Sequence, residues 1–533
     1  MLLSTEDRSL ERMQHPHQRR HDLWAYCQQR QPAHPNLVGK SYLVGVPSQV
    51  RVGQLWSFAV VSRWINGSQR HSLADLYTAH ARGPALLTEE GSPVGGGEYQ
   101  FSLTLPLAGP YVMTITLDHA DCHQSYTCSH SRAADFERPS FEQHNLTVFA
   151  VRTADQRLGL PGDSLPAVLT GTWISRLALE AIVSSHAKSC GSRSFNLSSM
   201  GTACRHAVAA QAQLHSSHLA HDPFYWWPPT SSAVTWKACT GQWMLFVGDS
   251  LDRQLFGSVA QAVNQSGHQV RCAGQRQSER IALLGSGTPH DKLKFMDWSG
   301  VPAYADRWWC LAPSLGLVLS YQSAGTRAGI GHDIDKLASV AAVHRDMILK
   351  GIETPLALVN ASYPALLHGA DATPTSIVVN FGLHAVSQLP YDAQGNWTGG
   401  AYTDNVKALL ARLRDVFPKA RLVWRRTAAT QFPTAHLSSK FACRSKPRVD
   451  TANLLADRVV REATDTVLDM AELTRTQRWG APDNRHYGDT EVNHVASSLL
   501  KNLVCRSKRS EVDRSARSET SGQRGASSRD PRL

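Results

Sequence analysis

The segment WMLFVGDSLDRQLFGSVAQAV, residues 243–263, predicts the fold of the larger part of the chain. Residues 243–247 form a continuous apolar run, which is typical of a strand buried on both faces. From residue 255 to residue 263 the apolar positions recur at helical spacing. The segment therefore predicts a strand, a short turn at 248–250 and a helix.

The same alternation continues towards the C-terminus. A buried strand is expected over 376–381, a helix around 406–413, strands over 421–424 and 467–469, and a closing helix over 492–503. Doubly buried strands between amphipathic helices indicate a parallel sheet covered on both faces, an α/β/α domain. In such sheets the functional residues lie on loops at the carboxyl ends of the strands.

The N-terminal part has a different pattern. Residues 41–121 alternate apolar and polar positions in short runs separated by turns, which predicts a β-sandwich. The stretches 95–99 and 107–115 resemble the closing hairpins of immunoglobulin-like filamin repeats. The predicted domains are a poorly ordered extension over 1–40, the sandwich over 41–150, an irregular linker over 151–219, the α/β/α domain over 220–505 and a disordered basic tail over 506–533.

Charge and cysteine usage limit the classes of function. The net charge is +11, but the basic residues are scattered and accompany no nucleic-acid-binding pattern, so we expect no nucleic-acid partner. The ten cysteines form no C-x-x-C pair, which favours disulfides over a zinc or redox motif. Sequons for N-glycosylation occur at Asn66, Asn145, Asn196, Asn264, Asn360 and Asn396.

Disulfides and sequons together predict a protein of the secretory pathway, in the Golgi lumen or outside the cell. The N-terminal residues show no signal peptide, and no apolar run is long enough to span a membrane. Membrane association would therefore require an anchor or a partner outside this sequence. A cytosolic protein with free thiols and unused sequons is the alternative.

Ser250 is the predicted nucleophile. It follows the buried strand directly and opens the helix, where unpaired backbone N–H groups favour developing negative charge. The tripeptide 162–164 is also Gly-Asp-Ser, but Pro161 precedes it and Pro166 follows, so it has neither strand nor helix around it. An ordinary helix-capping serine is the structural alternative for Ser250.

A serine nucleophile requires a base and a group that orients the base. Asp483 and His486 share one short loop before the closing helix, so His486 is the predicted base and Asp483 its orienting partner. Asn380 and Gly382 follow another buried strand; with the Ser250 backbone N–H they are the predicted oxyanion hole. Alternatively, Asn-x-Gly is simply a turn.

Two further residues are candidates for substrate contact. Arg253 lies one helical turn after Ser250 and would either clamp a substrate or pair with an acid in the fold. His384 would contact the substrate or the nucleophile loop, or serve as a hydrogen-bonded structural histidine. The tryptophans at 226, 227, 308 and 309 are either sugar-stacking residues or, more in keeping with their type, core residues.

These motifs, FVGDSLDR at 246–253, VVNFGLH at 378–384 and DNRHY at 483–487, resemble the PC-esterase branch of the GDSL/SGNH hydrolase superfamily. The branch includes trichome-birefringence-like polysaccharide O-acetyltransferases, sialic-acid O-acetyltransferases, and neurexophilin and PC-esterase proteins, which also carry a β-sandwich before the catalytic domain. The resemblance covers residues 220–505 and includes YWWP at 225–228 and WRRT at 424–427.

The resemblance implies a triad of Ser250, Asp483 and His486, with Asn380 in the oxyanion hole. The plant enzymes continue their D-x-x-H with Trp and Cys, whereas Tyr487 and Gly488 follow here, which leaves plant-wall substrates in doubt. The family's oxyanion glycine has no clear counterpart, and Gly325 is the nearest candidate.

The predicted function is transfer of an acetyl group to a hydroxyl of a glycan or glycoconjugate through an acyl-serine. The resemblance implies no metal and no tightly bound cofactor; acetyl-CoA or an acetyl ester would be the co-substrate. Hydrolysis by the same triad is the first alternative. The second is a secreted binding protein that acts through its β-sandwich.

Overall fold

The structure is a computed structural model. It describes residues 41–64, 66–70, 75–119, 143–151, 172–190, 224–227, 234–276, 296–297, 305–323, 373–380, 383, 399–430, 446–477, 486–487 and 491–505.

The C-terminal part is built on an eight-stranded sheet of order β14-β13-β15-β16-β12-β17-β18-β19. The five neighbouring strands β16, β12, β17, β18 and β19 are parallel. Strands β15, β13 and β14 continue the sheet beyond β16 as antiparallel strands. The strands are β12 (Trp243–Gly248), β13 (Arg271–Arg276), β14 (Met296–Asp297), β15 (Ala305–Ala312), β16 (Leu317–Ser323), β17 (Ser376–Val379), β18 (Arg421–Arg425) and β19 (Thr466–Leu468).

Within the parallel part, the first strand of the chain, β12, lies between the second, β16, and the third, β17. This is the 2-1-3-4-5 order of doubly wound sheets, in which ligands bind where the strand order reverses, at the carboxyl ends of the first and third strands. The topology therefore selects the loops after β12 and β17 as the place for a site.

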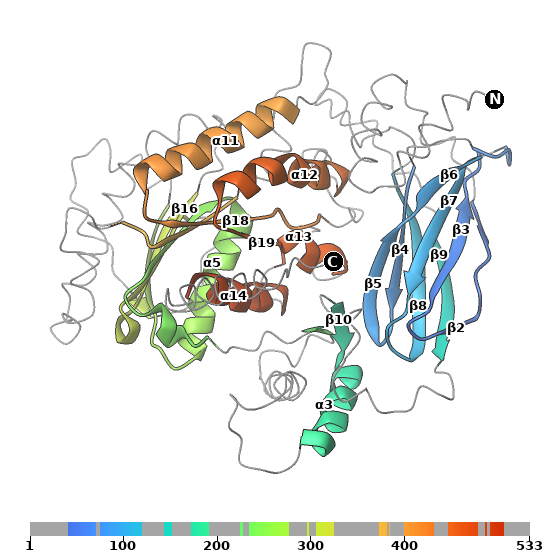
Figure 1. The fold of residues 1–533 in the computed structure, drawn as a ribbon, viewed down its shortest axis with the longest axis horizontal. Helices are drawn as coiled ribbons and strands as arrows, with labels where there is room; N and C mark the ends of the chain where they lie inside the picture. Colours follow the sequence, from blue (N-terminus) through green and yellow to red (C-terminus); the bar gives the residue numbers. More distant parts are fainter. Residues whose placement is uncertain are drawn as a thin grey trace, which may run out of the picture.

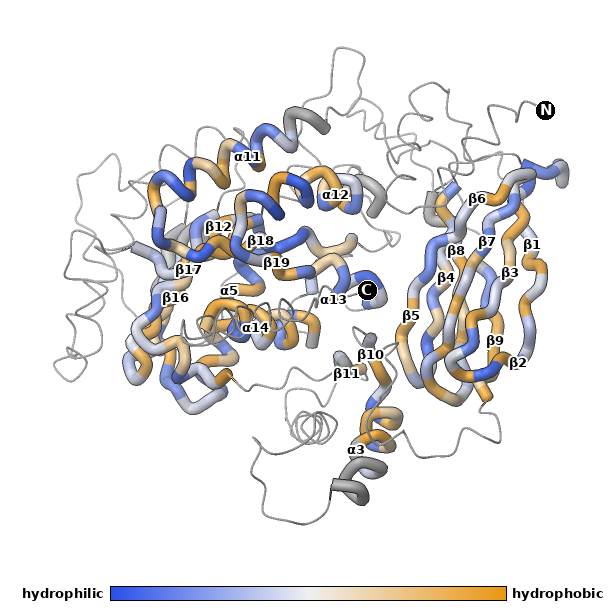
Figure 2. Tube along the Cα trace, viewed as in Figure 1, coloured by the Kyte–Doolittle hydropathy of each residue, from blue (hydrophilic) through white to orange (hydrophobic). Residues whose placement is uncertain are grey.

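Helices cover both faces of this sheet (Figure 1). They are α5 (Ser250–Gln265), α11 (Gly399–Val416), α12 (Lys446–Ala463), α13 (Met470–Arg475) and α14 (Glu491–Val504). α11 packs beside α12 on one face, and α5 packs beside α14 on the other. Figure 2 shows hydrophilic residues alternating with apolar ones along α11 and α12, as expected of helices with one face on a core.

The N-terminal part is a sandwich of two sheets with a common core. One sheet has the order β1-β3-β7-β6 and the other β11-β10-β5-β4-β8-β9-β2. Phe58, Phe101 and Tyr99 of the first sheet and Tyr77 and Met113 of the second belong to one buried cluster. The strands are β1 (Tyr42–Val44), β2 (Gln49–Arg51), β3 (Leu55–Val61), β4 (Leu76–Arg82), β5 (Ala85–Glu90), β6 (Ser92–Gly95), β7 (Glu98–Thr104), β8 (Gly109–His119), β9 (Gln143–Val151), β10 (Thr172–Ser175) and β11 (Phe224–Trp227).

The predicted elements of the α/β/α domain are confirmed as types, with boundaries that differ by a few residues. Two sheets with a common core are present in the N-terminal part, and their immunoglobulin-like or filamin-like character stays a prediction. The structure adds β10 and α3 (Arg176–Cys190) in the stretch 151–219, where the sequence predicted an irregular linker. It also adds the antiparallel strands β13 to β15. The duplicate Gly-Asp-Ser at 162–164 lies outside the described residues.

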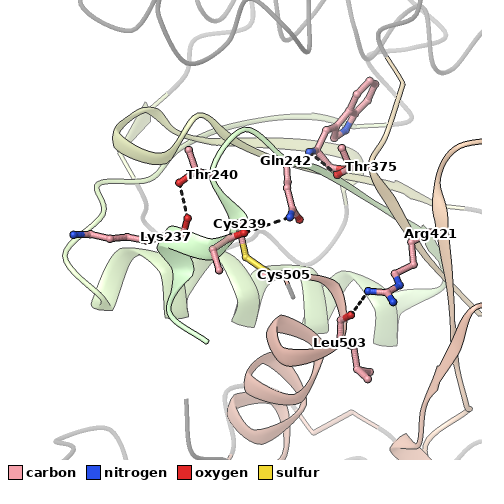
Figure 3. The surroundings of a disulfide bond; sticks show 10 residues. Lys237, Cys239, Thr240, Gln242, Thr375, Arg421, Leu503 and Cys505 are labelled. Atoms are coloured by element: carbon pink, nitrogen blue, oxygen red, sulfur yellow. Dashed lines mark hydrogen bonds between the residues drawn. A yellow bond between two sulfur atoms is a disulfide. The ribbon is translucent and has the colours of Figure 1, made fainter. Parts of the chain in front are cut away.

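Two disulfides are present in the described chain. Cys272 and Cys310 join β13 to β15, where they are register partners. Cys239, at the end of the short 3-10 helix η5 (Trp236–Cys239), is bonded to Cys505, which follows α14 (Figure 3). Near this bond, Arg421 donates a 2.7 Å hydrogen bond to the Leu503 carbonyl, one of the last carbonyls of α14.

The Cys239–Cys505 bond should contribute more stability than Cys272–Cys310, because it closes a loop of 266 residues rather than 38. Loop-closure entropy gives about 5.6 kcal/mol for the long loop and about 4 kcal/mol for the short one. We expect the double variant Cys239→Ser/Cys505→Ser to have the lower free energy of unfolding in denaturant titrations. A larger loss for Cys272→Ser/Cys310→Ser would contradict this expectation.

Candidate active site

Ser250 is the first residue of α5 and directly follows the Gly248-Asp249 turn at the end of β12. Asp249 is the N-cap of the helix and its carboxylate accepts a 2.9 Å hydrogen bond from the Leu251 N–H. In return, the Asp252 carboxylate accepts a 3.1 Å hydrogen bond from the Asp249 N–H, which completes a capping box. The start of the helix is thereby fixed immediately around Ser250.

The Ser250 hydroxyl lies beside a histidine that is far away in sequence. The Oγ atom of Ser250 and the Nε2 atom of His486 are 2.7 Å apart, and both residues are partly exposed. When Nδ1 carries the ring proton, Nε2 accepts the hydroxyl proton, which is the arrangement required of a nucleophile and its base. The structure thus brings together the predicted nucleophile and the predicted base.

Two neighbours leave room only for glycine at position 248. A Cβ atom there would lie 2.0 Å from the Asp252 carboxylate and 2.8 Å from the Asn380 carbonyl oxygen. The Tyr321 hydroxyl, from β16, donates to the carbonyls of Gly248 and Asp249 at 3.2 and 3.0 Å. The nucleophile turn is therefore held from a neighbouring parallel strand.

Arg425, the last residue of β18, lies under the turn and is 1% exposed. Its Nε and Nη2 atoms donate to the two carboxylate oxygens of Asp252 at 2.5 and 3.0 Å, and Nη2 lies 3.8 Å from the Asp249 carboxylate. Burial raises the pKa of Asp252 to about 6, although Arg425 lowers it. One buried cation thus faces the two acids that cap the nucleophile helix.

Asn380 is fully buried in the same network. Its amide nitrogen donates to the Arg425 carbonyl at 2.5 Å and to the Thr427 hydroxyl at 3.0 Å, and its oxygen accepts from Arg425 Nη2 at 3.2 Å. Because these bonds use both N–H groups of the amide, this conformation does not present Asn380 as an oxyanion donor. The structure therefore places the Asn380 amide in the support of the turn, and its role in an oxyanion hole stays a prediction.

Arg253 lies on the first turn of α5 and is partly exposed. Within the described ranges, its guanidinium forms no ion pair or side-chain hydrogen bond. The expectation that Arg253 pairs with an acid in the fold finds no support among these residues. Asp483, Gly382, His384 and Gly325, also predicted for the site, lie outside the described residues.

The tryptophans singled out from the sequence include core residues. Trp226 and Trp308 are 8% exposed and Trp309 is fully buried, which favours the core interpretation over sugar stacking for these three. Burial is not described for the side chain of Trp227.

The described residues contain no group of three or more His, Cys, Asp or Glu side chains placed to hold a metal ion. Among the helices described, none is both long and apolar enough to cross a membrane.

Sequence reasoning did not assign roles to Arg425, Asp252 or Tyr321. The available signal was the position of Arg425 at the end of the otherwise apolar strand Arg421–Arg425, because a buried cation requires a buried acid nearby. Asp252 carries the capping-box signal, three residues after an N-cap aspartate.

Fold and site together define an α/β protein with a serine–histidine pair at the switch point of a doubly wound sheet. No protein-family model and no curated protein matches the chain.

Solved structures that resemble this one include a peptidoglycan O-acetylesterase, with 10% identity over 50% of this chain and 93% of that chain and a TM-score of 0.28. A lipase/acylhydrolase from Enterococcus faecalis matches with 11% identity over 51% of this chain and 96% of its own, at a TM-score of 0.25. LAE5, an alpha/beta hydrolase enzyme from the metagenome of Lake Arreo, matches with 12% identity over 50% of this chain and 98% of its own, at a TM-score of 0.27. TM-scores this low assign neither family nor function.

Replacing Arg425 by methionine should leave Asp252 buried without its counter-charge. We expect Arg425→Met to lower the free energy of unfolding at pH 7 by about 3–5 kcal/mol, the usual cost of breaking a buried pair. Because Arg425 lowers the pKa of Asp252, its loss should raise that pKa further above 6. The difference from wild type should therefore shrink as the pH falls towards about 6, where Asp252 takes up a proton in the wild type as well.

Denaturant titrations at several pH values measure this difference. The exposed Arg176, paired with Glu180 on α3, supplies the control, because Arg176→Met should change stability little at any pH. A loss for Arg425→Met that is equal at pH 7 and pH 5 would contradict the assignment.

Proposed function

We propose that the chain is a serine-dependent acyl-transfer enzyme of the GDSL/SGNH type that moves acetyl groups onto hydroxyls of a glycan or glycoconjugate. The observation that carries the proposal is the 2.7 Å contact between Ser250 Oγ and His486 Nε2 at the switch point of the sheet. The two residues are 236 positions apart, so the fold itself brings them together.

In the first half of the reaction, Ser250 Oγ attacks the carbonyl carbon of the acyl donor while His486 takes the hydroxyl proton. The bond from the carbonyl carbon to the leaving oxygen or sulfur then breaks, and the leaving group receives that proton from His486. The product is an acyl-serine. The donor is an acetyl ester or a thioester such as acetyl-CoA.

In the second half, His486 takes the proton of an acceptor hydroxyl as its oxygen attacks the acyl carbon. The bond to Ser250 Oγ breaks, the proton returns to Ser250, and the acetylated acceptor leaves. Asp483 is assigned the role of fixing the His486 tautomer, with its position in the D-x-x-H pattern as support.

The negative charge of the tetrahedral intermediate needs hydrogen-bond donors. The backbone N–H of Ser250 lies at the N-terminus of α5, a helix of 16 residues, where N–H groups and the helix dipole favour an oxyanion. Because the Asn380 amide is engaged with Arg425 and Thr427 in this conformation, we assign the second donor to Gly382, two positions further along the sequence.

The finer features of the proposal are membership of the PC-esterase branch, an immunoglobulin-like or filamin-like sandwich, and work in the secretory pathway. The two disulfides support the last, since disulfides persist in oxidising compartments. Asn66 and Asn145 are exposed and Asn264 is partly exposed, so these three sequons are open to glycosylation.

Ser250→Ala should abolish both turnover of a chromogenic acetyl ester and labelling by a serine-directed fluorophosphonate. The change removes only the hydroxyl, so the melting temperature should stay close to that of wild type. Ser258, buried on α5, provides the control: Ser258→Ala should retain labelling. Undiminished labelling of Ser250→Ala, or no labelling of the wild type, would refute the site and leave the binding-protein alternative.

Transfer and hydrolysis differ in whether a sugar hydroxyl or water attacks the acyl-serine. Incubation with acetyl-CoA or an acetyl ester and a panel of oligosaccharides should yield acetylated sugar, detected by mass spectrometry. Transfer requires that the closed site exclude water. Release of acetate with no acetylated sugar would replace the transferase proposal by an esterase.

A further inference from the structure

Strands β10 and β11 are antiparallel partners that continue the edge of a sandwich sheet, and their two faces belong to two different cores. Ile174 and Tyr225 point into the core of the sandwich. Trp173 and Trp226, which alternate with them, belong to the core of the α/β/α domain. Successive side chains of a strand point to opposite faces, so β10 and β11 contribute to both cores and separate them. We call this pair of strands the shared wall.

Trp173 makes a specific contact across this wall. It is fully buried, and its indole Nε1 donates a 2.9 Å hydrogen bond to the Leu473 carbonyl of α13. The helix has six residues, and Arg426 holds its N-cap, Asp469, through a 2.7 Å ion pair. The Trp173 bond therefore fixes the helix near its other end.

From α13 the contacts continue to the loop that carries the proposed base. Thr474, next to Leu473, accepts a 2.8 Å hydrogen bond at its hydroxyl from the Ala429 N–H. The Ala429 carbonyl accepts a 2.7 Å hydrogen bond from the Tyr487 hydroxyl. Tyr487 is the residue after His486, and it is 1% exposed.

We propose that the β-sandwich positions the base of the active site, with Trp173 acting on His486 through α13, Ala429 and Tyr487. The series contains three hydrogen bonds between buried groups, and the chain itself joins Leu473 to Thr474 and Tyr487 to His486. Buried hydrogen bonds resist displacement because a broken one leaves an unpaired polar group. His486 itself is partly exposed, and its neighbour in the chain, Tyr487, is anchored by the last of these hydrogen bonds. Trp173 and Tyr487 are positioning residues, and their effect on catalysis rests on the proposed function.

Trp173→Phe keeps an aromatic ring in the wall and removes the donor to Leu473. We expect kcat for a chromogenic acetyl ester to fall by roughly 10- to 100-fold, the effect of misplacing a catalytic group by about 1 Å, with KM changed by less than about twofold. The rate of fluorophosphonate labelling at Ser250 should fall with kcat.

Trp226→Phe is the matched control. Trp226 packs edge-on against Trp173, with ring centroids 5.2 Å apart, in the same wall. No indole hydrogen bond from Trp226 is present among the described residues. Trp226→Phe should lose about as much stability as Trp173→Phe but keep the kcat of the wild type. Equal kcat losses in the two variants, or a loss confined to KM, would overturn the proposal.

Tyr487→Phe removes the last link, and its kcat should fall at least as far as that of Trp173→Phe. The double variant should be no worse than Tyr487→Phe alone, because both changes break one series of contacts. Independent, multiplicative losses would show that Trp173 does not act through Tyr487.

Hydrogen exchange of the peptide containing residues 486–487 gives a readout that does not need esterase activity. Faster exchange in Trp173→Phe than in Trp226→Phe supports the coupling, and equal exchange overturns it. If the fluorophosphonate does not label the wild-type protein, the proposed function is wrong. The hydrogen-exchange comparison still tests the structural coupling in that case.

Discussion

The buried ion pair between Arg425 and Asp252 supports the turn at Gly248 and Asp249, which places Ser250 at the start of α5. A guanidinium and a carboxylate out of water are stable only together, and their geometry has to be good because desolvation is costly. Here the Asp252 carboxylate also accepts a hydrogen bond from the Asp249 N–H, so Asp252 both caps α5 and neutralises Arg425. The position of Ser250 is therefore tied to β18, two strands away from β12 in the sheet.

Each parallel strand next to the turn contributes to this support. Tyr321 comes from β16, Asn380 follows β17, and Arg425 ends β18. Parallel strands end at the same edge of a sheet, which is why residues far apart in sequence converge there. The Ser250 hydroxyl thus lies on a turn fixed by buried hydrogen bonds, whereas His486 contacts it from outside the helices and strands.

The sequence predicted the strands and helices of the α/β/α domain well, because doubly buried strands and amphipathic helices leave clear apolar patterns. It also placed Ser250 and His486 in one site, from the strand-turn-helix context of one and the motif of the other. The contacts of Asn380 with Arg425 could not be predicted, because a strand-end asparagine looks the same in sequence whether its amide faces a substrate or an internal arginine. Strand β10 could not be predicted, because its four residues are too few to show a hydrophobic periodicity. Only its pairing with neighbouring strands and its position between the two cores define it.

The lengths of the outermost strands bear on how the molecule behaves in concentrated solution. Among the residues that the structure describes, the eight-stranded sheet ends in β14, of two residues, at one side and in β19, of three residues, at the other. An edge strand exposes unpaired backbone groups on which a second chain can add, and short edges offer few of them. The Cys272–Cys310 bond also holds the strands just inside β14 in register. Short borders such as these two described strands leave little backbone on which edge-to-edge aggregation could begin.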